Sequence, residues 1–110
     1  MRGEGAHPGD RLVLHGKAGS RRHAELRVYR NDRELVMRCA PPTTSDTFSC
    51  TRDGATISGE LKLPAIGAFQ ALIATSDAPL PAPGASLAED TERLLAMGAK
   101  VILAPSVRVF

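Results

Sequence analysis

The sequence has no tryptophan, one tyrosine and three phenylalanines among its 110 residues. Aromatic side chains therefore supply little of the surface available for burial, and we expect a core of aliphatic residues. Long apolar runs are missing too: none approaches the roughly 18 to 20 residues that a membrane-spanning helix requires, and residues 1–5 do not open a secretory signal peptide. We therefore expect a soluble chain, and any exporting segment would lie upstream of it.

The sequence also lacks a large excess of either positive or negative charge. Fourteen Lys and Arg residues stand against twelve Asp and Glu residues, so the net charge is +2 with neutral histidines. This excess is too small to predict binding of nucleic acid or of an anionic membrane. Six arginines gather near Tyr29, but acidic residues interrupt them, and we favour a solvated strand face over a nucleic-acid or acidic-partner site. They are Arg21, Arg22, Arg27, Arg30, Arg33 and Arg38.

Length and composition predict one domain over residues 1–110, with residues 1–8 expected to be flexible. A short strand is expected at 11–15, followed by a hairpin that turns at Asn31–Asp32. Pairing outward from this turn separates an apolar face from a mostly polar one. The apolar pairs are Val28 with Leu35, Leu26 with Met37, and Ala24 with Cys39; the others are Tyr29 with Glu34, Arg27 with Val36, and Glu25 with Arg38.

A second hairpin is predicted around Asp53–Gly54, a stronger turn signal. Its register places Cys50 opposite Ile57 and Phe48 opposite Gly59, where the phenylalanine would cover bare backbone. Cys50 therefore points toward the core, as Cys39 does in the first hairpin. This shared direction bears on how the two cysteines are used.

The second half of the chain contains one more clear strand and one helix. The strand is expected at 67–75, with Leu72 facing a second covered side, and an extended proline-containing connector follows at 76–85. A helix is predicted over 87–97, because Ser86 and Glu89 form a capping box and Gly98 is a natural stop. Its buried face is expected to hold Leu87, Thr91, Leu94, Leu95 and Gly98.

Short strands, tight turns and one late helix predict a mainly β fold. We expect an immunoglobulin-like antiparallel β-sandwich, with Pro105 marking a strand edge or bend near the end of the chain.

The only two cysteines, Cys39 and Cys50, have ten residues between them. Zinc sites favour close cysteine pairs and four ligands, and dithiol redox centres favour a two-residue spacing beside a helix. Two buried free thiols are the simpler alternative. We favour a disulfide, because both hairpin registers aim the side chains at a common space. It would contribute roughly 2 to 3 kcal/mol and would indicate an oxidising compartment.

Catalytic patterns are not evident. His7, His15 and His23 recur every eight residues, but they have no acidic partners in the sequence that would make them acid or base catalysts. The chain also lacks a G-x-S-x-G elbow and a phosphate-binding glycine loop. We therefore expect no catalytic residue, no metal and no cofactor.

Several segments resemble a domain of anti-sigma-factor-like membrane proteins from GC-rich bacteria. They are Pro8-Gly9-Asp10, residues 24–35, residues 67–72, and Pro79-Leu80-Pro81 before the acidic helix. In that family a cytoplasmic zinc-binding domain holds the sigma factor, a single membrane span follows, and a domain like this one faces outward. The resemblance implies an extracytoplasmic sensing or scaffolding part without catalytic residues.

Three functions remain as hypotheses from the sequence. The first is a non-catalytic module that faces the periplasm or the cell exterior, binds a protein or envelope ligand and signals to a membrane-anchored neighbour; its expected contact residues are Arg27, Tyr29, Val36 and Arg38. The second is a small α/β ligand-binding or enzymatic domain that holds an anion at the Ser86 helix N-terminus. The third is weak homo-oligomer assembly through an exposed strand edge.

Overall fold

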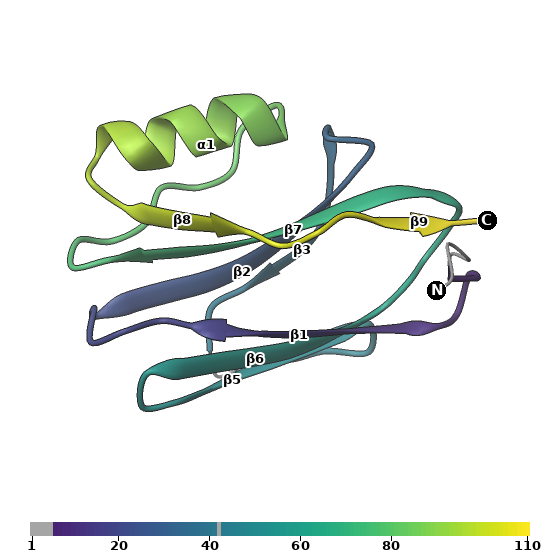
Figure 1. Ribbon diagram of the computed structural model, residues 1–110, viewed down its shortest axis with the longest axis horizontal. Coiled ribbons are helices and arrows are strands. Elements are labelled where there is room, and N and C mark those ends of the chain that lie inside the picture. Colours follow the sequence, from purple (N-terminus) through teal and green to yellow (C-terminus); the bar gives the residue numbers. More distant parts are fainter. Residues whose placement is uncertain (1–5, 42) are drawn as a thin grey trace.

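Two antiparallel sheets packed face to face, with one helix outside, make up the computed structural model, which describes residues 6–41 and 43–110 (Figure 1). The first sheet has the strand order β1-β6-β5-β4, and the second has the order β3-β2-β7-β8, with β9 also paired to β7. In chain order the elements are β1 (Arg11–Lys17), β2 (His23–Arg30), β3 (Glu34–Cys39), β4 (Thr43–Thr44), β5 (Phe48–Asp53), β6 (Thr56–Lys62), β7 (Gly67–Ser76), α1 (Leu87–Ala96), β8 (Lys100–Leu103) and β9 (Val107–Val109).

The expected mainly β antiparallel sandwich with one late helix is confirmed. Its strand order differs from that of immunoglobulin constant domains, in which the first and second strands lie side by side in one sheet. Here β1 pairs with β6, whereas β2 lies in the opposite sheet between β3 and β7. The chain therefore crosses between the sheets directly after β1.

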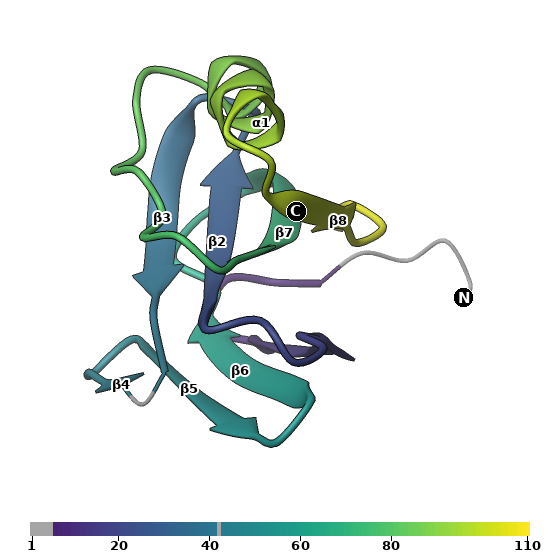
Figure 2. The same ribbon diagram turned by 90° about the vertical axis from the view of Figure 1, so that its left-hand side faces the viewer.

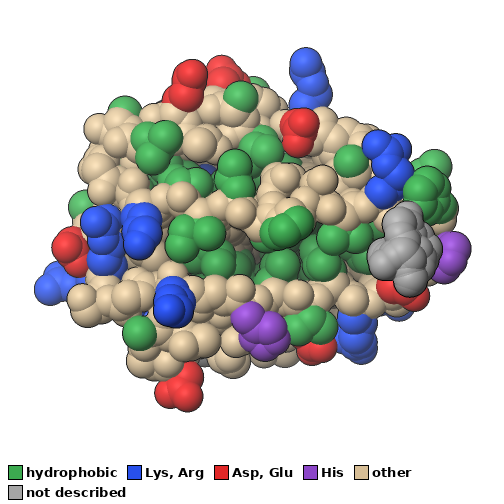
Figure 3. All heavy atoms as spheres, in the orientation of Figure 1, with side chains coloured by type: hydrophobic (Ala, Val, Ile, Leu, Met, Phe, Trp, Pro, Cys, Tyr) green, Lys and Arg blue, Asp and Glu red, His purple; other side chains and the backbone are tan. Residues whose placement is uncertain are grey.

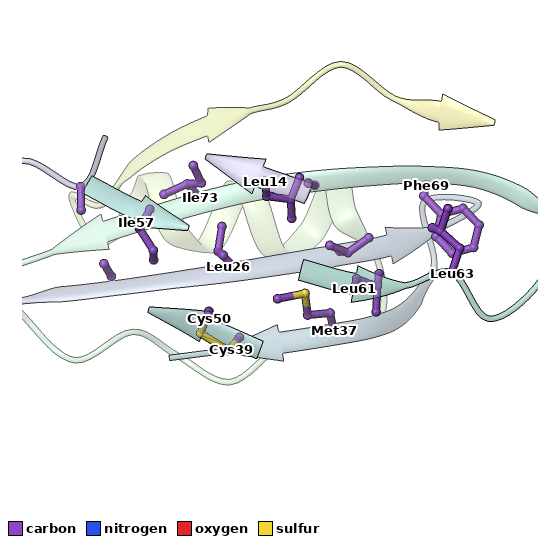
Figure 4. Close-up of a cluster of buried hydrophobic side chains, with 14 of the residues drawn as sticks. Leu14, Leu26, Met37, Cys39, Cys50, Ile57, Leu61, Leu63, Phe69 and Ile73 are labelled. Carbon is purple, nitrogen blue, oxygen red and sulfur yellow. A yellow bond between two sulfur atoms is a disulfide. The ribbon is translucent and has the colours of Figure 1, made fainter. Parts of the chain in front are cut away.

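The second sheet is covered on both faces, which gives the molecule three layers (Figure 2). Between the sheets lies an aliphatic core that includes Leu26, Met37, Ile57, Leu61 and Phe69, as Figure 4 shows. A smaller cluster lies between this sheet and α1; it consists of Tyr29, Leu72, Ala74, Leu94 and Ala99. The prediction that Leu72 faces a second covered side is thus confirmed. Central strands buried on both faces need side chains that suit two different environments.

The register predicted for the first hairpin is wrong, although its division into faces is largely right. Val28 pairs with Met37 rather than with Leu35, because the loop has three residues between Arg30 and Glu34 and an irregularity follows at Val28/Tyr29. A shift of two positions keeps each side chain on its face. Leu35 and Val36 are the exceptions. The irregularity places Leu35 opposite Tyr29, on the helix side of the sheet, and turns Val36 toward the core between the sheets.

The second hairpin is also shifted by two positions. Asp53 pairs with Thr56, so Gly54 and Ala55 form the turn, and Gly54 has a positive φ of 60°. Gly59 therefore lies opposite Cys50, and Phe48 lies opposite Leu61 instead of covering the glycine. The glycine is required by its neighbour across the core: a Cβ at position 59 would lie 2.5 Å from Cδ1 of Leu26.

The helix forms where it is predicted, but its buried face differs. Ser86 Oγ accepts a hydrogen bond from the Glu89 amide at 3.2 Å, and α1 ends at Ala96, before Gly98 with φ 88°. Asp90 and Leu94 are the buried residues, whereas Leu95, expected on that face, is 57% exposed. Only one of two adjacent leucines can face the sheet. Asp90 binds the Tyr29 hydroxyl of the sheet, and Leu94, one helical turn after Asp90, lies on the same face of the helix.

The two ends of the described chain lie side by side. Ala6 forms a parallel bridge with Val109, and its amide donates to the Arg108 carbonyl at 3.0 Å. Of the residues expected to be flexible, residues 1–5 lie outside the described part of the chain, whereas Ala6 is paired. Pro105 separates β8 from β9, both of which pair with β7, as expected for a proline at a bend.

We expect Gly59→Ala to lower the free energy of unfolding by about 1 to 3 kcal/mol, because the added methyl group overlaps Leu26. Urea denaturation measures this change. In a Leu26→Val background, which removes the clashing Cδ1 atom, the same substitution should cost clearly less. Equal costs in both backgrounds would contradict this account of the glycine.

Candidate functional site

Cys39 and Cys50 form a disulfide, as the sequence predicted, with their Cα atoms 6.2 Å apart. Cys39 is on β3 and Cys50 is on β5, so the bond connects one sheet to the other through the core (Figure 4). Both residues are buried, at 0% and 2% exposure. This burial indicates a structural bond and not one presented to redox partners.

The predicted contact surface on the first hairpin is wrong for its two central residues. Arg27 and Tyr29 are each 1% exposed, because α1 and the connector before it cover this face of β2. Val36 is half-buried and packs against the core between the sheets, so it does not join them. Only Arg38 remains exposed. The prediction failed because the hairpin pattern does not show that a later helix covers its polar face.

Arg27 is the centre of a buried polar network under the connector. Its Nε donates to Glu25 Oε2, and its Nη2 donates to the Pro81 carbonyl. Glu25 Oε2 also accepts from Arg38 Nε at 3.1 Å. Burial alone lowers the pKa of Arg27, but the ion pair with Glu25 outweighs it and the net pKa is raised. The charged arginine therefore attaches the connector to the sheet.

Tyr29 and Asp90 attach the helix to the same face. The Tyr29 hydroxyl donates to Asp90 Oδ2 at 2.6 Å, and Asp90 Oδ1 accepts from the Gly84 amide at 2.7 Å. Burial and the hydrogen bond to the Asp90 carboxylate raise the pKa of Tyr29 to about 12. Tyr29 and Asp90 hold the helix against the sheet. Tyr29, which the sequence analysis proposed as a contact residue, therefore has a structural role.

The helix N-terminus has two of its first three amides already bound. A hollow of about 660 Å³ lies beside it, lined by Asp32, Arg33, Ser86, Glu89 and Leu103 among others. However, the Leu87 amide donates to the Asp32 carbonyl at 2.9 Å, and the Glu89 amide is bound by Ser86. An anion there would also meet the Asp32 and Glu89 carboxylates. The geometry therefore gives the anion-binding hypothesis no support.

The three histidines lie in separate places. His7 is in the turn before β1, His23 begins β2, and His15 lies 3.1 Å from Ser58 Oγ on the exposed outer face of the first sheet. A histidine and serine surrounded by water lack the desolvated, oriented setting that activates a nucleophile. Among residues 6–41 and 43–110, no group of three or more His, Cys, Asp or Glu side chains is arranged to hold a metal ion.

A basic surface that sequence reasoning missed lies at the end of the sandwich away from Ala6 and Phe110. We call it the basic end; its residues are Lys17, Arg21, Arg22, Arg52 and Lys100. They come from the end of β1, the β1–β2 loop, the end of β5 and the start of β8. Positively charged side chains gather on this left-hand end in Figure 3. Sequence reasoning missed the group because pairing of distant strands brings it together.

Two arginines hold the loops of the basic end. Arg52 donates to the carbonyls of Gly19 and Arg21 at 3.1 and 2.6 Å, and also to those of Arg22 and Gly54. Arg21 in turn donates to the carbonyls of Thr75 and Gly98 at 3.2 and 3.1 Å. Their hydrogen bonds go to uncharged oxygens, so the positive charges are not neutralised by ion pairing.

Charge balance differs sharply between the first hairpin and the basic end. On the hairpin, Arg27 and Arg38 share Glu25, and Arg30 binds Glu34 at 3.0 Å. At the basic end, none of the five Lys and Arg residues forms a salt bridge with another described residue. The nearby acids are Asp53, Asp77 and Glu25. Asp77 accepts from the backbone amide of Arg22, and Glu25 is paired with Arg27 and Arg38.

Comparisons with protein-family models, with curated proteins and with solved structures found no match to this chain. The function proposed for it therefore depends on its own geometry. Within the described residues, the single helix α1 has ten residues and neither the length nor the apolar character to cross a bilayer.

The Tyr29 environment can be tested directly, because the chain has one tyrosine and no tryptophan. We expect the hydroxyl to titrate near about 12 in the native protein and near 10 in urea. The raised folded pKa means that the stabilisation from Tyr29 is complete below about pH 10 and is lost as the pH rises toward about 12. Ultraviolet absorbance of tyrosinate measures both values.

The matched control for this titration is Asp90→Asn, which keeps the burial of Tyr29, the larger cause of its raised pKa, and removes the carboxylate that adds to it. In this variant the native titration should move down toward the ordinary value. A native midpoint near 10 in the unaltered protein would show that Tyr29 is not buried against Asp90.

Proposed function

We propose that this chain is a non-catalytic interaction module that works outside the cytoplasm, on the periplasmic or extracellular face. The observation that carries the proposal is the buried Cys39–Cys50 bond between the two sheets. Disulfides persist in oxidising compartments and are rare in the reducing cytosol. A small sandwich with an aliphatic core gains stability from such a bond.

We propose that this chain binds partners in the way that immunoglobulin-like modules do, through loops at one end of the sandwich, although its strand order differs from theirs. A sandwich held by a disulfide keeps its strand ends rigid, and loops at one end of it can vary and bind. The basic end has this position in the molecule, with loops from several strands side by side. It replaces Arg27 and Tyr29 as the candidate contact surface.

We further propose, from the resemblance of residues 24–35 and 67–72, that the chain is the outward-facing part of an anti-sigma-factor-like membrane regulator. In this arrangement the module would bind a protein or envelope ligand and pass the signal to a membrane-anchored neighbour. Ala6 and Phe110 lie side by side, so connections from either end of the domain would leave it at one place.

The compartment is tested by trapping thiols in the native host with a membrane-permeant alkylating reagent before lysis. The trapped protein is then unfolded in the same reagent, so that burial does not shield a free thiol. We expect no alkylated cysteine when it is unfolded without reductant and two when it is unfolded after reduction, because both cysteines are bonded. Mass spectrometry gives the count. Two alkylated thiols in the protein unfolded without reductant would overturn the proposed function.

Removing the bond gives a second, separate measurement. We expect Cys39→Ala/Cys50→Ala to lower the free energy of unfolding by about 2 to 3 kcal/mol, and urea denaturation measures the difference. The unaltered protein in reducing agent is the matched control, since it loses the same bond without a change of side chain. An unchanged stability in both samples would show that the bond is not structural.

A further inference from the structure

We propose that the basic end binds an acidic surface of a protein partner, with carboxylate groups seated against Arg22, Lys100 and the arginine-held loops between them. This inference names the partner chemistry of the proposed module. It rests on the proposed function in one respect only: the choice of a protein over nucleic acid as the acidic partner follows from the location outside the cytoplasm proposed above.

The first support is unneutralised charge at one end of a nearly neutral molecule. Lys17, Arg22 and Lys100 are exposed, and their side chains form neither a hydrogen bond nor a salt bridge with other described residues. Such charges speed the encounter with an oppositely charged surface and select against basic partners. On the first hairpin, by contrast, Arg27, Arg30 and Arg38 each form an ion pair with Glu25 or Glu34.

The second support is that the basic end is rigid before any partner arrives. Arg52 holds three carbonyls of the β1–β2 loop, and Arg21 connects this loop to β7 and to the turn after α1. Loops that are already ordered lose little conformational entropy on binding. The structure therefore presents its free charges in a fixed arrangement.

The third support is position. The long axis of the molecule is 37 Å, so its two ends are well separated. The basic end lies opposite Ala6 and Phe110. A chain leaving from either terminus would leave this end free to meet a partner.

The shape of the basic end favours a protein over a flat bilayer. A hollow of about 350 Å³ beside Arg52 is lined by Arg22, His23 and Glu25, and the Glu25 carboxylate in it is already paired with Arg27 and Arg38. A hollow of this size accepts a protruding side chain, whereas a planar membrane would touch only the projecting loops. The Arg22 guanidinium at its edge matches the planar geometry of Asp and Glu carboxylates.

The probe for this test is immobilised poly-L-glutamate, with binding of the full chain followed by biolayer interferometry across a salt series. We expect binding that weakens as salt rises and that falls about tenfold or more in Arg22→Glu/Lys100→Glu, since two attractive charges become repulsive. The matched control is Lys62→Glu/Arg108→Glu, which makes the same charge change near the opposite end. It should retain affinity within about threefold.

Arg22→Gln/Lys100→Gln removes the two charges without reversing them and keeps the test usable if the glutamate variant does not fold. Equal losses in the variants of both ends would overturn the proposal, because net charge alone would then explain binding. Tighter binding to phosphatidylglycerol vesicles or to duplex DNA than to polyglutamate would overturn it as well. These outcomes leave the thiol measurement unaffected, so the two proposals fail separately.

Discussion

The burial of the Arg27 guanidinium against Glu25 is the interaction on which the outer half of the molecule depends. A charge placed inside a protein must be paired and hydrogen-bonded, because leaving it alone costs several kcal/mol. Glu25 supplies the opposite charge, and the Pro81 carbonyl supplies a further acceptor. The connector must therefore cross the sheet where Arg27 can reach it. Helix α1 follows, and Asp90 then binds the Tyr29 hydroxyl.

This arrangement gives β2 two different faces, both buried. Ala24, Leu26 and Val28 enter the aliphatic core between the sheets, whereas Glu25, Arg27 and Tyr29 hold the connector and the helix. The disulfide secures the other direction by connecting β3 of the second sheet to β5 of the first. The disulfide and the contacts of Arg27 and Tyr29 thus hold the three layers together. The strand ends away from the chain termini take no part in these contacts, and they carry the loops and charges of the basic end. The molecule thus separates the residues that hold it together from those proposed to bind.

Arginine has three distinct uses in this chain, and its environment decides which. Arg27 is buried beside a carboxylate, Arg52 binds backbone carbonyls and holds a loop, and the exposed side chain of Arg22 forms no ion pair with any other described residue. From the sequence, six arginines near Tyr29 formed one group; in the structure that group is divided by pairing with Glu25 and Glu34. The surface with unneutralised charge instead draws on residues as distant as Lys17 and Lys100. Contacts between distant strands therefore matter more than sequence proximity for locating this surface.

The sequence by itself determined the features that depend on local periodicity and chemistry. Alternation in the hairpins identified the inward faces and so the pairing of Cys39 with Cys50, and the capping pattern at Ser86 located the helix to within a residue. The hairpin registers were missed by two positions, since loop length and an irregularity at Val28/Tyr29 decide them while the faces stay the same. Only the tertiary structure decided that Arg27 and Tyr29 are covered, that Leu95 is exposed and that Arg52 and Lys100 join Lys17, Arg21 and Arg22 at one end. Burial and charge pairing are set by which segments pack together, and that choice is made by long-range contacts that no local pattern contains.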